Sequence, residues 1–69
     1  MKHYVLDGVI NGRPMSPRSY LTRKEAEKRL CDILTQRNLQ VEDDRIPQKH
    51  TEEFVCNQYT RFFIRRVLA

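Results

Sequence analysis

The sequence predicts an α+β fold in which one helix packs on a small, mostly antiparallel sheet, and two observations lead to this class. Residues 22–37 repeat apolar side chains with the period of a helix. Residues 3–10 and 53–68 are instead rich in the β-branched and aromatic residues that favour strands. Because 69 residues suffice for one domain, we expect residues 1–69 to form a single unit of order βαββ with three or four strands.

The first expected strand covers residues 3–10, HYVLDGVI, which show no helical period. Asn11-Gly12 follows, and this dipeptide marks a turn because both residues accept a positive φ. Residues 13–19 contain two prolines and are expected to form a loop. The chain is therefore expected to leave the sheet here, before the helix begins.

The helix is predicted by its start signal and by its apolar stripe. Thr22 and Glu25 form a capping box, in which the hydroxyl accepts a backbone hydrogen bond and the carboxylate reaches back. Glu25 can also pair with Arg29, four residues further on. The stripe recurs at helical spacing over about four turns and has Arg37 at its far end. Its apolar residues, expected to cover one face of the sheet, are Ala26, Leu30, Ile33 and Leu34.

The last part of the chain is expected to supply the remaining strands. Residues 39–42 favour a short strand, and residues 42–51 an acidic turn followed by a proline-containing loop. Residues 53–57 and 59–68 both favour strand by composition. Asn57-Gln58 is a weak turn signal, so the sequence allows either a hairpin at this point or one long strand.

The segment YTRFFIRRV, residues 59–67, brings three aromatic residues and three arginines together. In a strand, alternate side chains share a face. One face carries Phe62, Ile64 and Leu68 and is expected to pack against the helix. Val5 or Leu6 of the first strand is expected to join this core. The other face carries the candidate binding set Tyr59, Arg61, Phe63 and Arg65. Tyr4 is a further candidate for this face, and Arg13 and Arg18 in the proline-containing loop are expected near one end of the sheet.

This candidate set predicts a surface for nucleic acid. Aromatic rings stack on the bases of single strands while guanidinium groups hold the phosphates. The net charge of +4 and the pI near 9.4 also favour a polyanionic partner. Residues 54–69 contribute three arginines and no acidic residue. The leading hypothesis is therefore a small non-enzymatic module that binds DNA or RNA.

Two other interpretations of the same residues stay open. Aromatic residues and arginine are also enriched in protein interfaces, which predicts an interaction module, either a homodimer or a small regulator that inhibits a larger enzyme. The acidic segment 42–44 would then be a second contact. The structural interpretation is that aromatic cross-strand pairs stiffen the sheet and that arginines on a strand discourage edge pairing.

Several classes of function are disfavoured by the composition. Cys31 and Cys56 are too few and too far apart for a disulfide framework, and no signal peptide is visible, so a reduced, cytoplasmic protein is expected. No segment approaches the roughly 20 apolar residues of a membrane span. The cysteines combine with His3 and His50 in no spacing known for zinc, and no nucleophile is placed beside a base. We therefore expect no metal site, no cofactor and no catalytic residue.

Overall fold

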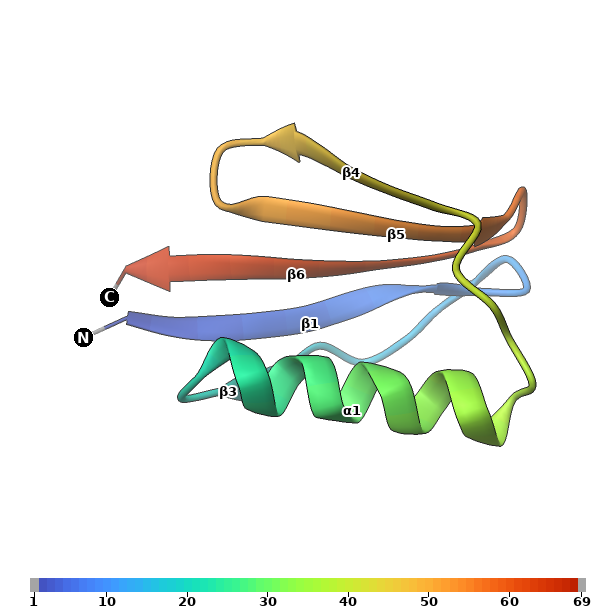
Figure 1. Ribbon diagram of the computed structural model, residues 1–69. Helices are drawn as coiled ribbons and strands as arrows, with labels where there is room; N and C mark the ends of the chain where they lie inside the picture. The colour runs from blue at the N-terminus through green and yellow to red at the C-terminus, as the bar shows by residue number, and fades with distance from the viewer. Residues whose placement is uncertain (1, 69) are drawn as a thin grey trace.

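The computed structural model describes residues 2–68, which form one helix and six strands in a single sheet (Figure 1). In chain order the elements are β1 (Lys2–Ile10), β2 (Arg13–Pro14), β3 (Arg18–Tyr20), α1 (Arg23–Gln36), β4 (Asp43–Gln48), β5 (Thr51–Asn57) and β6 (Thr60–Leu68). The strands lie in the order β2-β1-β6-β5-β4, with β3 also paired to β1, and all pairs are antiparallel. The α+β class is confirmed, but the sheet has more strands than the three or four expected.

The first and last strands of the described chain, β1 and β6, are neighbours at the centre of the sheet. Their register places Lys2 opposite Leu68 and Gly8 opposite Phe62. At Gly8 the strands approach so closely that a Cβ atom would lie 2.9 Å from the Cα of Phe62 and nearer still to the carbonyl oxygen of Arg61. A larger residue at Gly8 would therefore push the two central strands apart.

Strands β5 and β6 form a hairpin, which decides between the two arrangements that the sequence allowed. Asn57 lies opposite Thr60, so the turn consists of Gln58 and Tyr59, one residue later than the Asn57-Gln58 turn considered from the sequence. The backbone N–H of Tyr59 donates to Oδ1 of Asn57 at 2.8 Å. The asparagine side chain thus completes the turn, as short polar side chains often do.

Two regions expected as loop or turn are edge strands. Strands β2 and β3 lie in the proline-containing segment, and β4 takes the place of the predicted acidic turn, whereas residues 39–42 form no strand. A neighbouring strand with free hydrogen-bonding groups recruits such segments whatever their composition, which is why local preference fails here. Pro47 lies where the β4 register shifts between Arg45 and Gln48, on the outer strand of the sheet, so its missing N–H is tolerated.

Helix α1 begins and ends with recognisable capping structures. The N–H of Glu25 donates to Oγ1 of Thr22 at 3.2 Å, and the Thr22 hydroxyl donates to Oε1 of Glu25 at 3.0 Å, which confirms the predicted capping box. After the helix, Asn38 adopts a φ of 54°, and the N–H of Leu39 donates to the carbonyl of Leu34 at 2.8 Å. This is a Schellman-type end, in which asparagine takes the place of the usual glycine.

The hydrophobic core lies between α1 and the central strands, because the helix packs on β1, β3 and β6. Its buried members are Leu6, Ala26, Leu30, Ile33, Cys56, Phe62 and Ile64. The predicted stripe is confirmed, with Leu34 only partly buried. Leu68, expected in the core, is instead 73% exposed because it stands at the end of β6.

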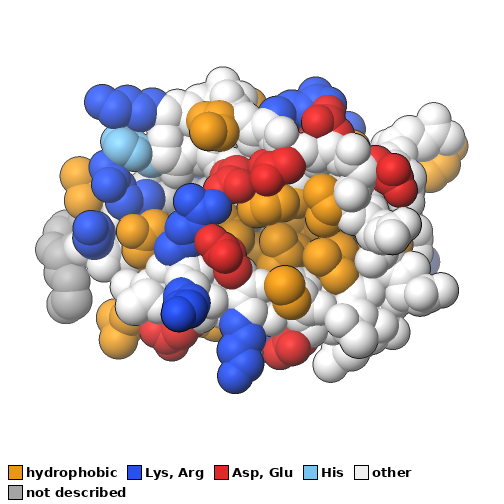
Figure 2. All heavy atoms as spheres, in the orientation of Figure 1, with side chains coloured by type: hydrophobic (Ala, Val, Ile, Leu, Met, Phe, Trp, Pro, Cys, Tyr) orange, Lys and Arg blue, Asp and Glu red, His pale blue; other side chains and the backbone are white. Residues whose placement is uncertain are grey.

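Along the described chain, the helix backbone packs on the central strands and on β3 and does not approach β4 or β5 (Figure 1). Figure 2 shows the result: hydrophobic side chains reach the surface between the helix and the outer strands, with acidic side chains beside them. Within residues 2–68, no helix is both long and apolar enough to span a membrane.

Candidate functional site

The face of the sheet opposite the helix, called the open face below, holds three of the six predicted site residues. Arg61, Phe63 and Arg65 alternate along β6 with residues that face the core, as expected from the strand period. Phe63 lies at the centre of this face, with Asp7 of β1 on one side and Glu53 of β5 on the other. The aromatic ring is therefore flanked by two arginines along its own strand and by two carboxylates across the neighbouring strands.

Ion pairs hold both predicted arginines of the open face. Nη2 of Arg65 lies 2.7 Å from Oδ2 of Asp7, and Nη1 of Arg61 lies 3.0 Å from Oε2 of Glu53. Arg45 of β4 also approaches Glu53, with 3.8 Å between Nε and Oε1, and pairs with its near neighbour Asp43. The hydrogen bond that Arg45 donates to the carboxylate of Asp43, followed by the negative charge of Asp43, raises the pKa of Arg45.

These pairs change what the open face is able to bind. Three arginines meet three carboxylates, so the paired groups sum to no net charge. Glu53 is only 5% exposed, and a phosphate that drew Arg61 away would leave this carboxylate buried without its closest partner. Such a loss is costly for a buried charge. The open face is therefore poorly suited to phosphate.

The two tyrosines considered for stacking lie elsewhere. Tyr59 belongs to the β5–β6 turn and is 61% exposed. Tyr4 lies opposite Arg66 on the helix side of the sheet and packs against the core. Of the predicted aromatic residues, Phe63 alone lies on the open face. Stacking of several bases requires several aromatic rings in a row, which the predicted set does not supply there.

A hollow of about 680 Å³ lies over the open face. Phe63 and Val9 form part of its lining, together with Met15 and Pro17 from the segment between β2 and β3 and Pro47 from β4. An apolar centre bordered by paired charges is the composition of a protein interface more than of a nucleic-acid groove.

The two predicted loop arginines, Arg13 and Arg18, belong to a different surface. Arg13 and Arg37 line a hollow of about 540 Å³, and Arg18, Arg29 and Arg37 line a second one of about 200 Å³. The two hollows are adjacent, because both are also lined by Ile10, Met15 and Arg37. We call this surface the arginine groove; its charged members are Arg13, Arg18, Arg29 and Arg37.

The arginine groove differs from the open face in its electrostatics. Among the described residues, no aspartate or glutamate lines either of its hollows. Within residues 2–68, its four arginines form no ion pair, whereas both predicted arginines of the open face do. Ile10, Met15 and Ile33 add apolar surface to the lining of these hollows, and long arginine side chains commonly pack their aliphatic parts on such surface while the guanidinium groups stay solvated.

Arg29 and Arg37 were not predicted from the sequence as members of this groove. Arg29 was expected to be able to pair with Glu25, but no Glu25–Arg29 ion pair is present among the described residues, and Glu25 bonds to Thr22 instead. The signal that was available is the spacing of Arg29, Ile33 and Arg37 at i, i+4 and i+8, which places both arginines on one helix face. Their proximity to the loop arginines required knowledge of the tertiary fold.

The two cysteines differ in their exposure to solvent. Both cysteines are free thiols; Cys31 is exposed, while Cys56 is buried, which raises the pKa of its thiol, and the charge of Glu42 adds to this effect. In the part of the chain that the structure describes, no three or more His, Cys, Asp or Glu side chains gather where they would hold a metal ion.

Comparisons of this chain with models of known protein families, with curated proteins and with solved structures found no match. Its class is therefore defined by the fold and the surfaces described above: a small α+β domain with a charge-compensated sheet face and a separate groove of unpaired arginines.

Proposed function

We propose that this protein is a small non-enzymatic binding module that holds the phosphate backbone of nucleic acid in the arginine groove. One observation carries the proposal: within residues 2–68, four arginines that form no ion pair line two adjoining hollows, and no carboxylate lines either hollow. Arginine contacts to phosphate supply most of the affinity in sequence-independent binding, and guanidinium groups match phosphate geometry.

The dimensions of the groove fit a short stretch of backbone. Arg29 on α1 and Arg37, the residue that caps its C-terminal end, are eight residues apart, which is about 12 Å along the helix axis. Successive phosphates of one duplex strand advance by about 3.4 Å along the axis, so this separation covers between three and four steps. Arg13 lines one of the two hollows from the short strand β2, and Arg18 lines the other from β3; backbone pairing to β1 limits the movement of both strands.

The proposal is tested by the salt dependence of binding. With four phosphate contacts, the plot of log K against log salt concentration should have a slope of about −3.6 for duplex DNA and about −2.8 for a single strand. Between about 50 and 200 mM salt, the affinity should then fall by about 150-fold for the duplex and about 50-fold for the single strand. Fluorescence anisotropy with labelled, mixed-sequence oligonucleotides measures both slopes.

Charge-matched variants locate the contact. Arg18→Gln with Arg37→Gln should reduce the duplex slope by about 1.8, because two phosphate contacts are lost. Lys24→Gln with Lys28→Gln removes the same charge from two exposed positions on another part of the helix and should leave the slope within about 0.5 of the wild type. Binding that is insensitive to salt, or an equal reduction in both variants, would refute the arginine groove as the site.

A second candidate function, a protein-interaction module, is favoured by the hollow of about 680 Å³ around Phe63. We propose a second copy of this chain as its occupant. The paired charges of the open face sum to zero, so two such faces meet without net repulsion, whereas two arginine grooves would repel each other. A chain this short also gains stability from a second subunit.

Sedimentation velocity over a range of protein concentrations tests this arrangement. Phe63→Ala should weaken dimerisation by about thirtyfold, the loss of about 2 kcal/mol expected for a central aromatic contact. Tyr59→Ala removes an exposed aromatic residue outside the open face and serves as the control. A protein that stays monomeric at every concentration, or equal effects of both variants, would exclude the open face as a dimer interface.

A further inference from the structure

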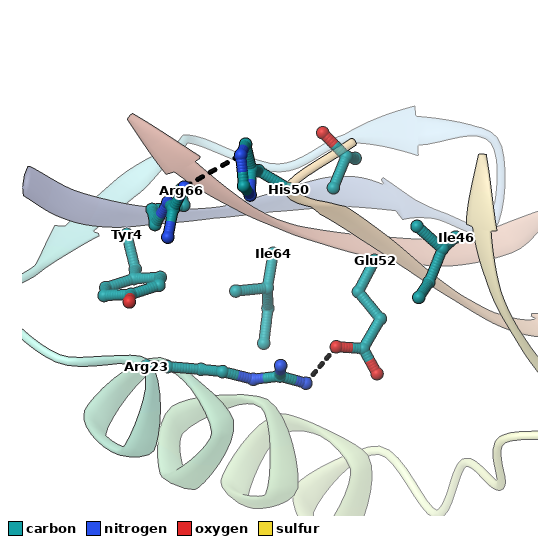
Figure 3. Close-up of a pocket in the computed structure, with 8 residues that line it drawn as sticks. Tyr4, Arg23, Ile46, His50, Glu52, Ile64 and Arg66 are labelled. Atoms are coloured by element: carbon teal, nitrogen blue, oxygen red, sulfur yellow. Dashed lines mark hydrogen bonds and ion pairs between the residues drawn. The ribbon is translucent and has the colours of Figure 1, made fainter. Parts of the chain in front are cut away.

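A fourth hollow lies on the helix side of the sheet, between the start of α1 and the β4–β5 hairpin (Figure 3). Its volume is about 300 Å³, and it shares no lining residue with the arginine groove. The residues that line it are Tyr4, Arg23, Ile46, His50, Thr51, Glu52, Ile64 and Arg66. Figure 2 shows basic side chains gathered beside a histidine at one end of the same face of the molecule.

Arg66 and His50 form one wall of this pocket, and their contact fixes the state of the imidazole. Nη2 of Arg66 lies 2.8 Å from Nε2 of His50. An arginine side chain only donates, so Nε2 of His50 must accept, and the ring is neutral with its proton on Nδ1. The backbone N–H of Arg66 also donates to the carbonyl of His50 at 2.9 Å, and His50 has a φ of 64°. The turn after β4 is thereby held against β6.

The hydrogen-bonding capacity of Arg66 is not used up by these contacts. Its Nε is the one buried side-chain nitrogen or oxygen within residues 2–68 that has no hydrogen-bond partner. A guanidinium group carries five N–H donors, and buried polar groups are normally paired. Nη1 of Arg66 also forms no hydrogen bond within residues 2–68 and, unlike Nε, is not buried, so an acceptor from outside the chain can reach it.

Arg23 and Glu52 form the opposite wall, close to the helix (Figure 3). Arg23 bonds to Glu52 and also to Glu27, whose Oε1 lies 2.6 Å from Nε of Arg23. Partial burial raises the pKa of Glu52 despite the charge of Arg23, which acts in the opposite direction. Glu52 is the one carboxylate that lines the pocket, and its charge is already matched by Arg23.

The balance of charges and donors in the pocket indicates the kind of ligand it takes. Arg23 is shared by Glu52 and Glu27, so Arg66 is the arginine of this pocket that has no carboxylate partner within residues 2–68, while His50 is neutral. The hydroxyl groups of Tyr4 and Thr51 add donors, whereas Ile46 and Ile64 provide apolar surface. The pocket therefore offers more hydrogen-bond donors than acceptors, one unmatched positive charge and a small apolar wall. These features suit a singly charged oxyanion that carries a short aliphatic group.

We propose that this pocket is a binding site for a small organic monocarboxylate, with the carboxylate on Arg66 and the aliphatic group against Ile46 and Ile64. His50 is a positioning residue, because it holds one end of the Arg66 guanidinium group in place. The proposal is independent of the nucleic-acid function, since the pocket and the arginine groove have no lining residue in common.

The test is an NMR titration of the labelled protein with isobutyrate, at fixed pH and ionic strength. We expect shifts of the amide signals of residues 50–52 and 64–66, with a dissociation constant in the millimolar range that suits a ligand of so few atoms. Isobutyramide has the same shape without the charge, and inorganic phosphate is an oxyanion without the aliphatic group. Isobutyrate should bind at least about tenfold more tightly than isobutyramide, since its hydrogen bonds to arginine are charge-assisted.

Neighbouring arginines on opposite faces of β6 provide the matched control. Arg66→Gln should weaken isobutyrate binding by about tenfold, while Arg65→Gln, which removes the same charge from the open face, should change it by less than about twofold. His50→Gln should also weaken isobutyrate binding, because Arg66 is then no longer held in place. This variant replaces Arg66→Gln in the test if Arg66→Gln does not fold. Each of four outcomes would overturn the assignment: equal binding of isobutyramide and isobutyrate, equal effects of the two arginine variants, tighter binding of phosphate than of isobutyrate, or no amide shifts with isobutyrate.

Discussion

The ion pair between Arg61 and Glu53 decides whether the open face is free to hold phosphate, and a double-mutant cycle measures it. At the 3.0 Å between Nη1 and Oε2, Coulomb's law with an effective dielectric constant of about 20 gives an attraction of about 5.5 kcal/mol. The Arg61 side chain is 44% exposed, so solvent screens the pair, and the burial of Glu53 costs hydration. We therefore expect a coupling energy of about 1.5 kcal/mol, above the 0.2–1 kcal/mol of ordinary surface pairs.

Urea denaturation of the wild type, Arg61→Gln, Glu53→Gln and the double variant gives this coupling energy. The contact of Glu53 with Arg45 cancels in the cycle, because it is lost in both variants that change Glu53. The pair of Arg23 and Glu27 is the control, since both side chains are about half exposed and should couple by about 0.4 kcal/mol. An Arg61–Glu53 coupling no larger than that control would refute the reasoning that the open-face arginines are occupied.

Three further predictions follow from the core and the titratable groups. Phe62→Ala should lower the free energy of unfolding by about 3–5 kcal/mol, measured in urea, because the ring is fully buried. Cys31 should react with a thiol reagent in the native protein, while Cys56 reacts only on unfolding, as alkylation followed by mass spectrometry would show. The pKa of His50 should lie below its ordinary value of 6.5, chiefly through loss of hydration and then through the charge of Arg66, so that Arg66→Gln raises this pKa in an NMR titration. Because the unfolded chain then takes up the proton first, the contribution of His50 to stability is lost as the pH falls from about 6.5 through its folded pKa.

Local signals in the sequence were sufficient for the helix. The Thr22–Glu25 capping box and the apolar stripe act within a few residues of chain, so they determine where the helix starts and which face it buries. The edge strands could not be predicted in this way, because they depend on pairing with neighbouring strands and not on local signals. Strand β4 exists because β5 offers it hydrogen-bonding partners, and a segment that contains Pro47 gives little sign of this by itself.

The residues of the candidate site were likewise predictable only where local signals determine them. The period of a strand was enough to place Arg61, Phe63 and Arg65 on one face, which the structure confirms. It did not reveal that Asp7, 58 residues from Arg65 in sequence, would neutralise one of these arginines. Contacts between distant parts of a chain depend on the strand order of the folded sheet, and this order was not accessible from local patterns.

The central pairing of β1 with β6 has a consequence for how the protein folds during synthesis. Phe62 and Ile64, two core residues, lie in the last strand, and their partners on β1 are more than 50 positions earlier. The helix and the β5–β6 hairpin are local and can form early, but the core cannot close until β6 has left the ribosome. We expect a nascent chain that ends before residue 60 to remain sensitive to protease, and protection to appear only when β6 is fully exposed beyond the exit tunnel.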